Sequence, residues 1–173
     1  MKVRNMARCA LFAALLTVCA WIAVPLGDVA FTMQTFGVFL ALGLLGGKWG
    51  TAAVFVYLLL GVAGAPVFSG FRGGIGVLMD ATGGYLAGFL VCALLYWLIT
   101  AIWGDGAKTR IFAMLLGLFA CYAFGTAWFF FGYLQGSGGI GLILIKCVLP
   151  YLLPDALKLA LACFLTGRLK RFV

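Results

Sequence analysis

Long, uninterrupted apolar runs dominate the chain, and short clusters of glycine, proline and charged residues separate them. A membrane-spanning strand alternates apolar and polar residues, whereas these runs are continuous, so the pattern predicts spanning helices. The predicted helices cover about residues 7–25, 35–46, 50–64, 82–103, 110–131 and 151–167. Because an α-helix rises ~1.5 Å per residue, the second and third are short for a ~30 Å hydrocarbon core, and we expect tilted or interrupted helices there.

The composition of the chain indicates that these helices lie in a lipid bilayer. Of its 173 residues, 66% are apolar and 9% are charged, whereas about a quarter of the residues in a soluble protein are charged. A chain of this size cannot bury that much apolar surface in a soluble fold. The predicted fold class is therefore an all-α integral membrane protein, a single domain over residues 1–173 that forms a six-transmembrane-helix bundle.

The net charge of +8 comes from basic residues that lie mainly at the ends of the apolar segments. This placement follows the positive-inside rule and does not indicate nucleic-acid binding. With a cytoplasmic N-terminus, the outer loops hold only Arg72 and Lys146 among the basic residues. We therefore predict that both termini are cytoplasmic, in a multi-pass protein of a prokaryotic plasma membrane.

The residues that usually form a catalytic or metal centre are scarce. The chain has no histidine, its six cysteines form no C-x-x-C pair, and its four acidic residues lie in separate segments. No G-x-x-x-x-G-K-[ST] phosphate loop is present either, so the chain is not expected to hydrolyse ATP. The sequence predicts neither an enzyme nor a bound cofactor or metal.

The strongest candidates for ligand binding are Asp155 and Lys158, within LPYLLPDALKLALACF at 149–164. Their i, i+3 spacing places them on one helix face, and ionisable residues at membrane depth normally face a partner or a wet cavity. Pro154 suits the first turn of a helix, where the helix dipole would also favour Asp155. This arrangement predicts a pair fixed at an outer helix start as part of a binding site. The alternative is an ion pair that only shields the two charges from lipid.

Three further stretches carry candidate residues. GDVAFTMQTFGVF, at 27–39, brings Thr32, Gln34 and Thr35 to the mouth of the second helix, either for a ligand or as ordinary caps. In SGFRGGIGVLMDATGGYLAGF, at 69–89, glycines permit a close backbone approach to a ligand, and Asp80 either contacts that ligand or caps the following helix. In ARCALFAALL, Ala10 and Ala14 form a stripe of small residues for a partner subunit or for packing within the bundle.

Together these stretches resemble the BioY family, the biotin-binding S components of energy-coupling factor (ECF) vitamin transporters. The resemblance covers nearly the whole chain. It is carried, in order, by ALFAALL, PLGDVAFTMQTFGVFLALGLLGGKWG, GVAGAPVFSGFRGGIGVLMDATGGYLAGF and LPYLLPDALKLALA. One departure concerns the third stretch, where the family often has Pro-Thr-Gly-Gly-Tyr and this chain has Ala81 in place of the proline, preceded by Asp80.

The resemblance implies a six-helix bundle that binds biotin near the extracellular face. Asp155 and Lys158 match the family's ligand-contacting acid and base, and Ala10 and Ala14 match the stripe that meets the transmembrane coupling subunit. Two ATPase subunits would supply the energy. Phe31, Tyr85 and Tyr151 would cover the bicyclic body of biotin.

Several alternatives stay open at this stage. Asp155 would accept from the ureido N–H groups, while Lys158 would meet either the ureido oxygen or the carboxylate tail. The spacing of the pair does not settle the ligand, so an S component for another small vitamin remains an alternative. A membrane assembly protein without a ligand is another.

Overall fold

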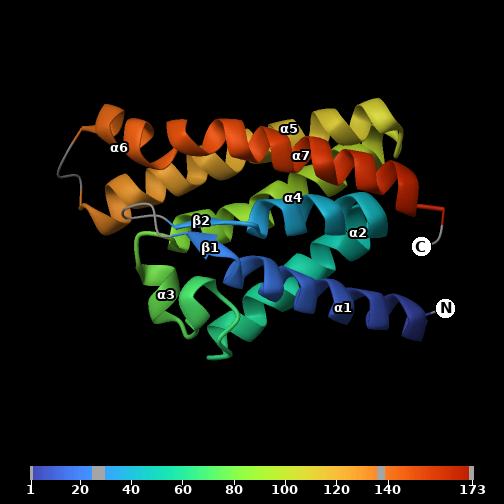
Figure 1. Cartoon of the computed structure of the whole chain (residues 1–173), viewed down its shortest axis with the longest axis horizontal. Helices are drawn as coiled ribbons and strands as arrows, with labels where there is room; N and C mark the ends of the chain where they lie inside the picture. The colour runs from blue at the N-terminus through green and yellow to red at the C-terminus, as the bar shows by residue number, and fades with distance from the viewer. Residues whose placement is uncertain (1, 25–29, 136–138, 172–173) are drawn as a thin grey trace.

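The computed structural model describes residues 2–24, 30–135 and 139–171, and the described chain is mostly helical (Figure 1). The helices are α1 (Lys2–Trp21), α2 (Gln34–Val62), α3 (Gly76–Met79), α4 (Gly83–Trp103), α5 (Ala107–Trp128), α6 (Ile140–Cys147) and α7 (Leu149–Leu169). A π-helical turn (Phe129–Tyr133) extends α5, and a 3₁₀ turn (Ser69–Phe71) precedes α3. Two short strands, β1 (Ala23–Val24) and β2 (Phe31–Thr32), pair antiparallel, which the all-α prediction did not include.

Five helices in the described part of the chain are long and apolar enough to cross a membrane. They are α1, α2, α4, α5 with its π-helical turn, and α7. Large apolar side chains lie exposed on these helices, for example Leu11 (67%), Leu98 (56%) and Leu157 (66%). Such a surface is unfavourable in water and favourable in lipid, so the predicted multi-pass membrane protein is confirmed.

The second and third predicted helices both lie within α2. Gly46 interrupts this helix with φ 77° and ψ 175°, a backbone conformation that glycine adopts without steric cost. After Gly46 the chain turns back, so the two halves of α2 run in opposite directions along the bundle (Figure 1). A Cβ atom on Gly50 would lie 2.8 Å from the Cα atom of Leu42, so glycine permits the close approach of the two halves.

The N-terminal end of α1 and the C-terminal end of α7 lie at one end of the bundle (Figure 1). The elements β1, β2, α3 and α6 lie at the other end. The first predicted helix was expected to reach Pro25, which lies outside the described residues; α1 ends at Trp21. The last was expected to begin at Tyr151, but α7 begins at Leu149. The end opposite the termini carries the candidate ligand residues.

A segment of 63–82, which we call the α2–α4 loop, covers one side of that end. Trp21 at the end of α1 donates its indole N–H to the carbonyl of Pro66 at 3.0 Å, and its ring lies 4.8 Å from the ring of Phe71. Phe68 is buried against Gly61 of α2, where any Cβ atom would collide with its ring. The loop is therefore anchored to both α1 and α2.

Candidate functional site

Asp155 and Lys158 form an ion pair on α7, with 2.7 Å between Asp155 Oδ1 and Lys158 Nζ. Both side chains are buried, at 4% and 6% exposure. The predicted helix start at Pro154 is wrong, because α7 begins at Leu149 and Pro154 lies inside it. Pro150 takes the first-turn position instead, where a missing N–H costs nothing. Helix packing and neighbouring side chains, rather than the first turn of the helix, therefore hold the pair.

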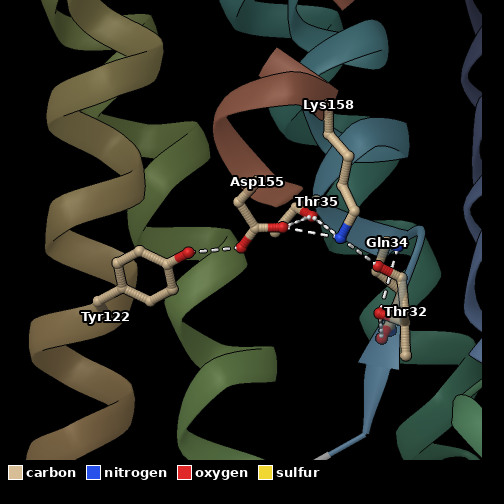
Figure 2. A network of polar contacts seen from close by, with 6 residues as sticks. All are labelled: Thr32, Gln34, Thr35, Tyr122, Asp155 and Lys158. Atoms are coloured by element: carbon tan, nitrogen blue, oxygen red, sulfur yellow. Dashed lines mark hydrogen bonds and ion pairs between the residues drawn. The ribbon is translucent and has the colours of Figure 1, made fainter. Parts of the chain in front are cut away.

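The ion pair has further partners on three other elements (Figure 2). Tyr122 of α5 donates to Asp155 Oδ2 at 2.5 Å, and Thr35 of α2 donates to Asp155 Oδ1 at 2.9 Å. Lys158 donates to the backbone carbonyl of Thr32 at 2.6 Å and to Thr35 Oγ1 at 3.2 Å. Each buried charge thus has hydrogen-bonding partners besides the opposite charge, which offsets the cost of removing it from water.

An aromatic group completes the surroundings of Lys158. Its ammonium lies 3.9 Å from the ring centre of Phe31, within range of a cation–π contact. Phe31 in turn lies stacked on Tyr151, with 6.4 Å between ring centres. The short strand β2 therefore places an aromatic face and a backbone acceptor beside the same ammonium group.

A second hydrogen-bond chain fixes the start of α2. Thr32 Oγ1 donates to Gln34 Oε1 at 2.8 Å, and Gln34 Nε2 donates to the Tyr57 hydroxyl at 2.6 Å. The Tyr57 hydroxyl donates to the carbonyl of Val67 at 3.2 Å. This chain connects β2, both halves of α2 and the α2–α4 loop.

These groups border a pocket whose empty volume, including its open mouth, is about 680 Å³. Small-molecule sites typically have apolar walls and a few converging polar groups. The pocket is lined by Ala30, Thr32, Gln34, Thr35, Phe68, Ser69, Arg72, Val77, Thr82, Tyr85, Leu86, Phe89, Cys121, Tyr122, Cys147, Tyr151, Asp155 and Lys158. Its chemistry is that of a site for an amphiphilic small molecule with polar groups at defined positions.

Most of the residues predicted from the sequence meet at this pocket. Those that line it are Thr32, Gln34, Thr35, Tyr85, Tyr151, Asp155 and Lys158. Phe31 does not line the pocket and lies against the ammonium of Lys158. The structure thus assembles one site from β2, α2, α4 and α7.

Asp80 lies outside the lining and pairs with Arg72, with 2.7 Å between Asp80 Oδ2 and Arg72 Nη1. Its other oxygen accepts the backbone N–H of Ala81 at 2.8 Å. The N–H of Ala81 and the guanidinium of Arg72 hold the pKa of Asp80 below its usual value. Asp80 is therefore ionised at neutral pH, and Arg72 joins it to the pocket wall.

Ala10 and Ala14 do not line this pocket and are exposed on α1. They border a separate groove, lined by Ala10, Ala13, Ala14, Thr17, Val18, Trp21, Val56 and Leu60. The groove lies between α1 and the second half of α2. Small side chains on one wall permit close approach of another helix.

Sequence reasoning missed two polar residues of the site. Tyr122 stands in an apolar stretch of α5, 33 positions from Asp155, and no local spacing connects the two residues. Arg72 was noted only as a basic residue of an outer loop, although it is one of the two basic residues that line the pocket. Its isolation in an outer loop with few other charges is a signal from which the sequence could have identified it.

A helical membrane bundle in which a buried, hydrogen-bonded ion pair lines a partly open pocket has the architecture of a membrane protein that binds a small solute. Comparison with known sequences identifies the family within this class. The chain belongs to the BioY family, which it matches over residues 1–173, so the predicted family is confirmed.

The relatives and a solved structure agree with this assignment. The chain is 38% identical over 175 residues to the biotin transporter BioY of Thermotoga maritima, covering 97% of this chain and 96% of the relative. It is 38% identical over 170 residues to a probable biotin transporter BioY of Pyrococcus horikoshii, covering 98% of each. The fold is similar to the S-component for biotin from an ECF-type ABC transporter, with a TM-score of 0.86 and 26% identity, over 98% of this chain and 92% of that one.

Proposed function

We propose that this chain binds biotin as the substrate-specific subunit of an ECF-type transporter. The observation that carries the proposal is the buried Asp155–Lys158 pair, facing a pocket in a BioY-family chain. The whole of residues 1–173 acts as one S-component unit. The named relatives are biotin transporters, which supports biotin over another small vitamin.

The polar groups at the base of the pocket match the ureido ring of biotin. That ring offers two N–H donors and one carbonyl acceptor. Asp155 supplies a carboxylate for the N–H groups, and Lys158 supplies an ammonium for the carbonyl, both as charge-assisted hydrogen bonds. Phe68, Tyr85 and Phe89 provide apolar walls for the bicyclic body.

The membrane topology that fits this role has six passes, with both termini in the cytoplasm. The break at Gly46 and the reversal of direction there support two passes within α2. The start of α1 and the end of α7 lie at the same end of the bundle, which requires an even number of passes between them (Figure 1). The pocket then opens at the extracellular face, where an uptake system meets its solute.

Energy would come from partner subunits. The groove at Ala10 and Ala14 is the surface proposed to meet the transmembrane coupling subunit, with two ATPase subunits beyond it. The solved structural neighbour is a component of an ECF-type ABC transporter, which supports an assembly of this kind. The lipid bilayer covers the remaining exposed apolar faces.

A binding assay on membranes containing this chain alone tests the proposal. We expect saturable binding of radiolabelled biotin, displaced by unlabelled biotin and not by thiamine or riboflavin. Membranes carrying the Arg4→Gln variant, altered at an exposed position on the end of α1 farthest from the pocket, serve as a matched control and should bind like the parent. Selective binding of another vitamin would indicate a different S component. The absence of binding for every vitamin tested would indicate a membrane assembly protein.

A further inference from the structure

The two basic residues that line the pocket lie at different depths. The Lys158 side chain is 6% exposed at the base, whereas the Arg72 side chain is 45% exposed on the α2–α4 loop. Arg72 therefore stands nearer the mouth, where the end of a bound ligand meets water. An elongated ligand with a polar group at each end can reach both residues.

The charge of Lys158 is already balanced within the site. Its ammonium donates to Asp155 Oδ1 at 2.7 Å and to the carbonyl of Thr32 at 2.6 Å, and both acceptors belong to the protein. An anion bound at Lys158 would stand beside the Asp155 carboxylate and compete with it for the ammonium, and placing two like charges together in a buried site is costly. The base of the pocket therefore suits a neutral polar group better than a carboxylate.

Arg72 has unused donor capacity. Its Nη1 meets Asp80 Oδ2 at 2.7 Å, and its Nε meets the carbonyl of Ser69 at 3.3 Å. Among the described residues, no partner is found for Nη2. A guanidinium binds a carboxylate best through two parallel N–H groups, so the single contact with Asp80 leaves room for a better carboxylate.

Asp80 can give up this contact at small cost. Its side chain is 37% exposed, so water can solvate the released oxygen. Its other oxygen, Oδ1, still accepts the hydrogen bond from the backbone N–H of Ala81 at 2.8 Å. An exposed ion pair contributes little to stability, so exchanging one carboxylate for another at Arg72 requires little reorganisation.

The backbone around both residues is held independently of their ion pair. The N–H of Phe68 donates to the carbonyl of Arg72 at 3.0 Å, and the indole of Trp128 on α5 donates to the carbonyl of Asp80 at 3.4 Å. The side chains can therefore change partners while the α2–α4 loop stays in place.

We infer that Arg72 binds the carboxylate of the ligand's tail and that Asp80 is an internal competitor for the same guanidinium. The inference rests on the proposed biotin-binding function. It assigns the neutral ureido ring to Asp155 and Lys158 at the base and the anionic tail to Arg72 at the mouth. The site then selects for ligands with a carboxylate at the tail, and competition from Asp80 limits the affinity of Arg72 for that carboxylate.

Calorimetric titration of the purified chain with biotin and with biotin amide, which lacks the tail charge, tests this assignment. We expect Arg72→Gln to weaken biotin binding about tenfold, near the low end for hydrogen bonds to a charged group. Binding of biotin amide should change less than about twofold, because the amide carries no tail charge. We expect Asp80→Asn to strengthen biotin binding about two- to fivefold, because the competing exposed ion pair is gone, with little change for the amide. The Arg72→Gln/Asp80→Asn variant should bind biotin like Arg72→Gln alone, because Asp80 acts only through Arg72.

Three results would overturn the inference. Equal losses for biotin and its amide in Arg72→Gln would show a structural role for the arginine. Unchanged biotin binding in Arg72→Gln would show that the tail lies elsewhere. Weaker biotin binding in Asp80→Asn would show that Asp80 supports the site rather than competes with the ligand. A parent chain that binds neither compound would instead refute the proposed function itself.

Discussion

Two ion pairs of the same length stand at different depths in this protein. Asp155–Lys158 and Arg72–Asp80 each have 2.7 Å between their charged atoms. The first pair is buried and makes four further hydrogen bonds: Tyr122 and Thr35 donate to Asp155, and Lys158 donates to the carbonyl of Thr32 and to Thr35 Oγ1. The second pair has side chains that are 45% and 37% exposed. Distance alone therefore does not tell what an ion pair does. Their surroundings differ: the first pair is buried and hydrogen-bonded on several sides, and the second is partly exposed, which is why we propose that only the second exchanges partners.

The largest expected effect is on the buried pair. Asp155→Asn and Lys158→Met should each weaken biotin binding at least about tenfold and destabilise the protein by ~3–5 kcal/mol, because each leaves the opposite charge buried and unpaired. Biotin titration and thermal unfolding in detergent measure the two quantities. The Asp155→Leu/Lys158→Met variant should recover most of the stability without recovering binding, because no buried charge remains. Full affinity in both single variants would contradict the role given to the pair.

A smaller effect is expected from Tyr122→Phe. This change removes one hydroxyl that donates to Asp155 Oδ2 at 2.5 Å. A hydrogen bond to a charged group contributes ~1.5–3 kcal/mol, and Thr35 still donates to the same carboxylate. We expect a stability loss within that range, measured by thermal unfolding, with Tyr133→Phe on the exposed end of the π-helical turn as the matched control. A loss no greater than that of the control would show that Tyr122 is dispensable.

The smallest effect concerns Arg72–Asp80. Asp80→Asn should change the free energy of unfolding by less than ~1 kcal/mol, because both side chains are more than a third exposed and screened by water. The pKa of Asp80 is lowered in the folded protein, so its contribution is present above the usual Asp pKa of ~3.9 and is lost as pH falls through the lowered value. Unfolding measured from pH ~8 to ~5 should therefore give a constant difference between parent and variant. A difference that disappears within that interval would contradict the assigned shift.

The sequence predicted the base of the site because local spacing carries that information. Asp155 and Lys158 share a helix face at i, i+3. Thr32 of β2 comes just before Gln34 and Thr35, which begin α2. Tyr122 was beyond reach, because its contact with Asp155 depends on how α5 packs against α7 and leaves no mark in local spacing. The sequence also predicted the two short apolar segments at 35–46 and 50–64. The structure explains why each is short, because the chain reverses direction at Gly46.

The start of the last helix shows the opposite case. Proline is common in the first turn of a helix, which made Pro154 a candidate for the start of α7. Pro150, four positions earlier, is an equally good candidate, and α7 begins at Leu149, before both prolines. Local propensity ranks such alternatives poorly when tertiary packing decides between them. The i, i+3 spacing thus predicted the ion pair correctly, whereas the predicted helix start at Pro154 was wrong.

Trp21 has a consequence for how mutants of this protein are interpreted. Its indole borders the groove on α1 and also holds the α2–α4 loop through Pro66 and Phe71. A substitution there alters two regions at once, the groove proposed to meet a partner subunit and the loop beside the proposed solute site. A transport defect in a Trp21 variant could therefore come from impaired assembly or from impaired solute binding. Separate measurements of subunit assembly and of solute affinity distinguish the two causes.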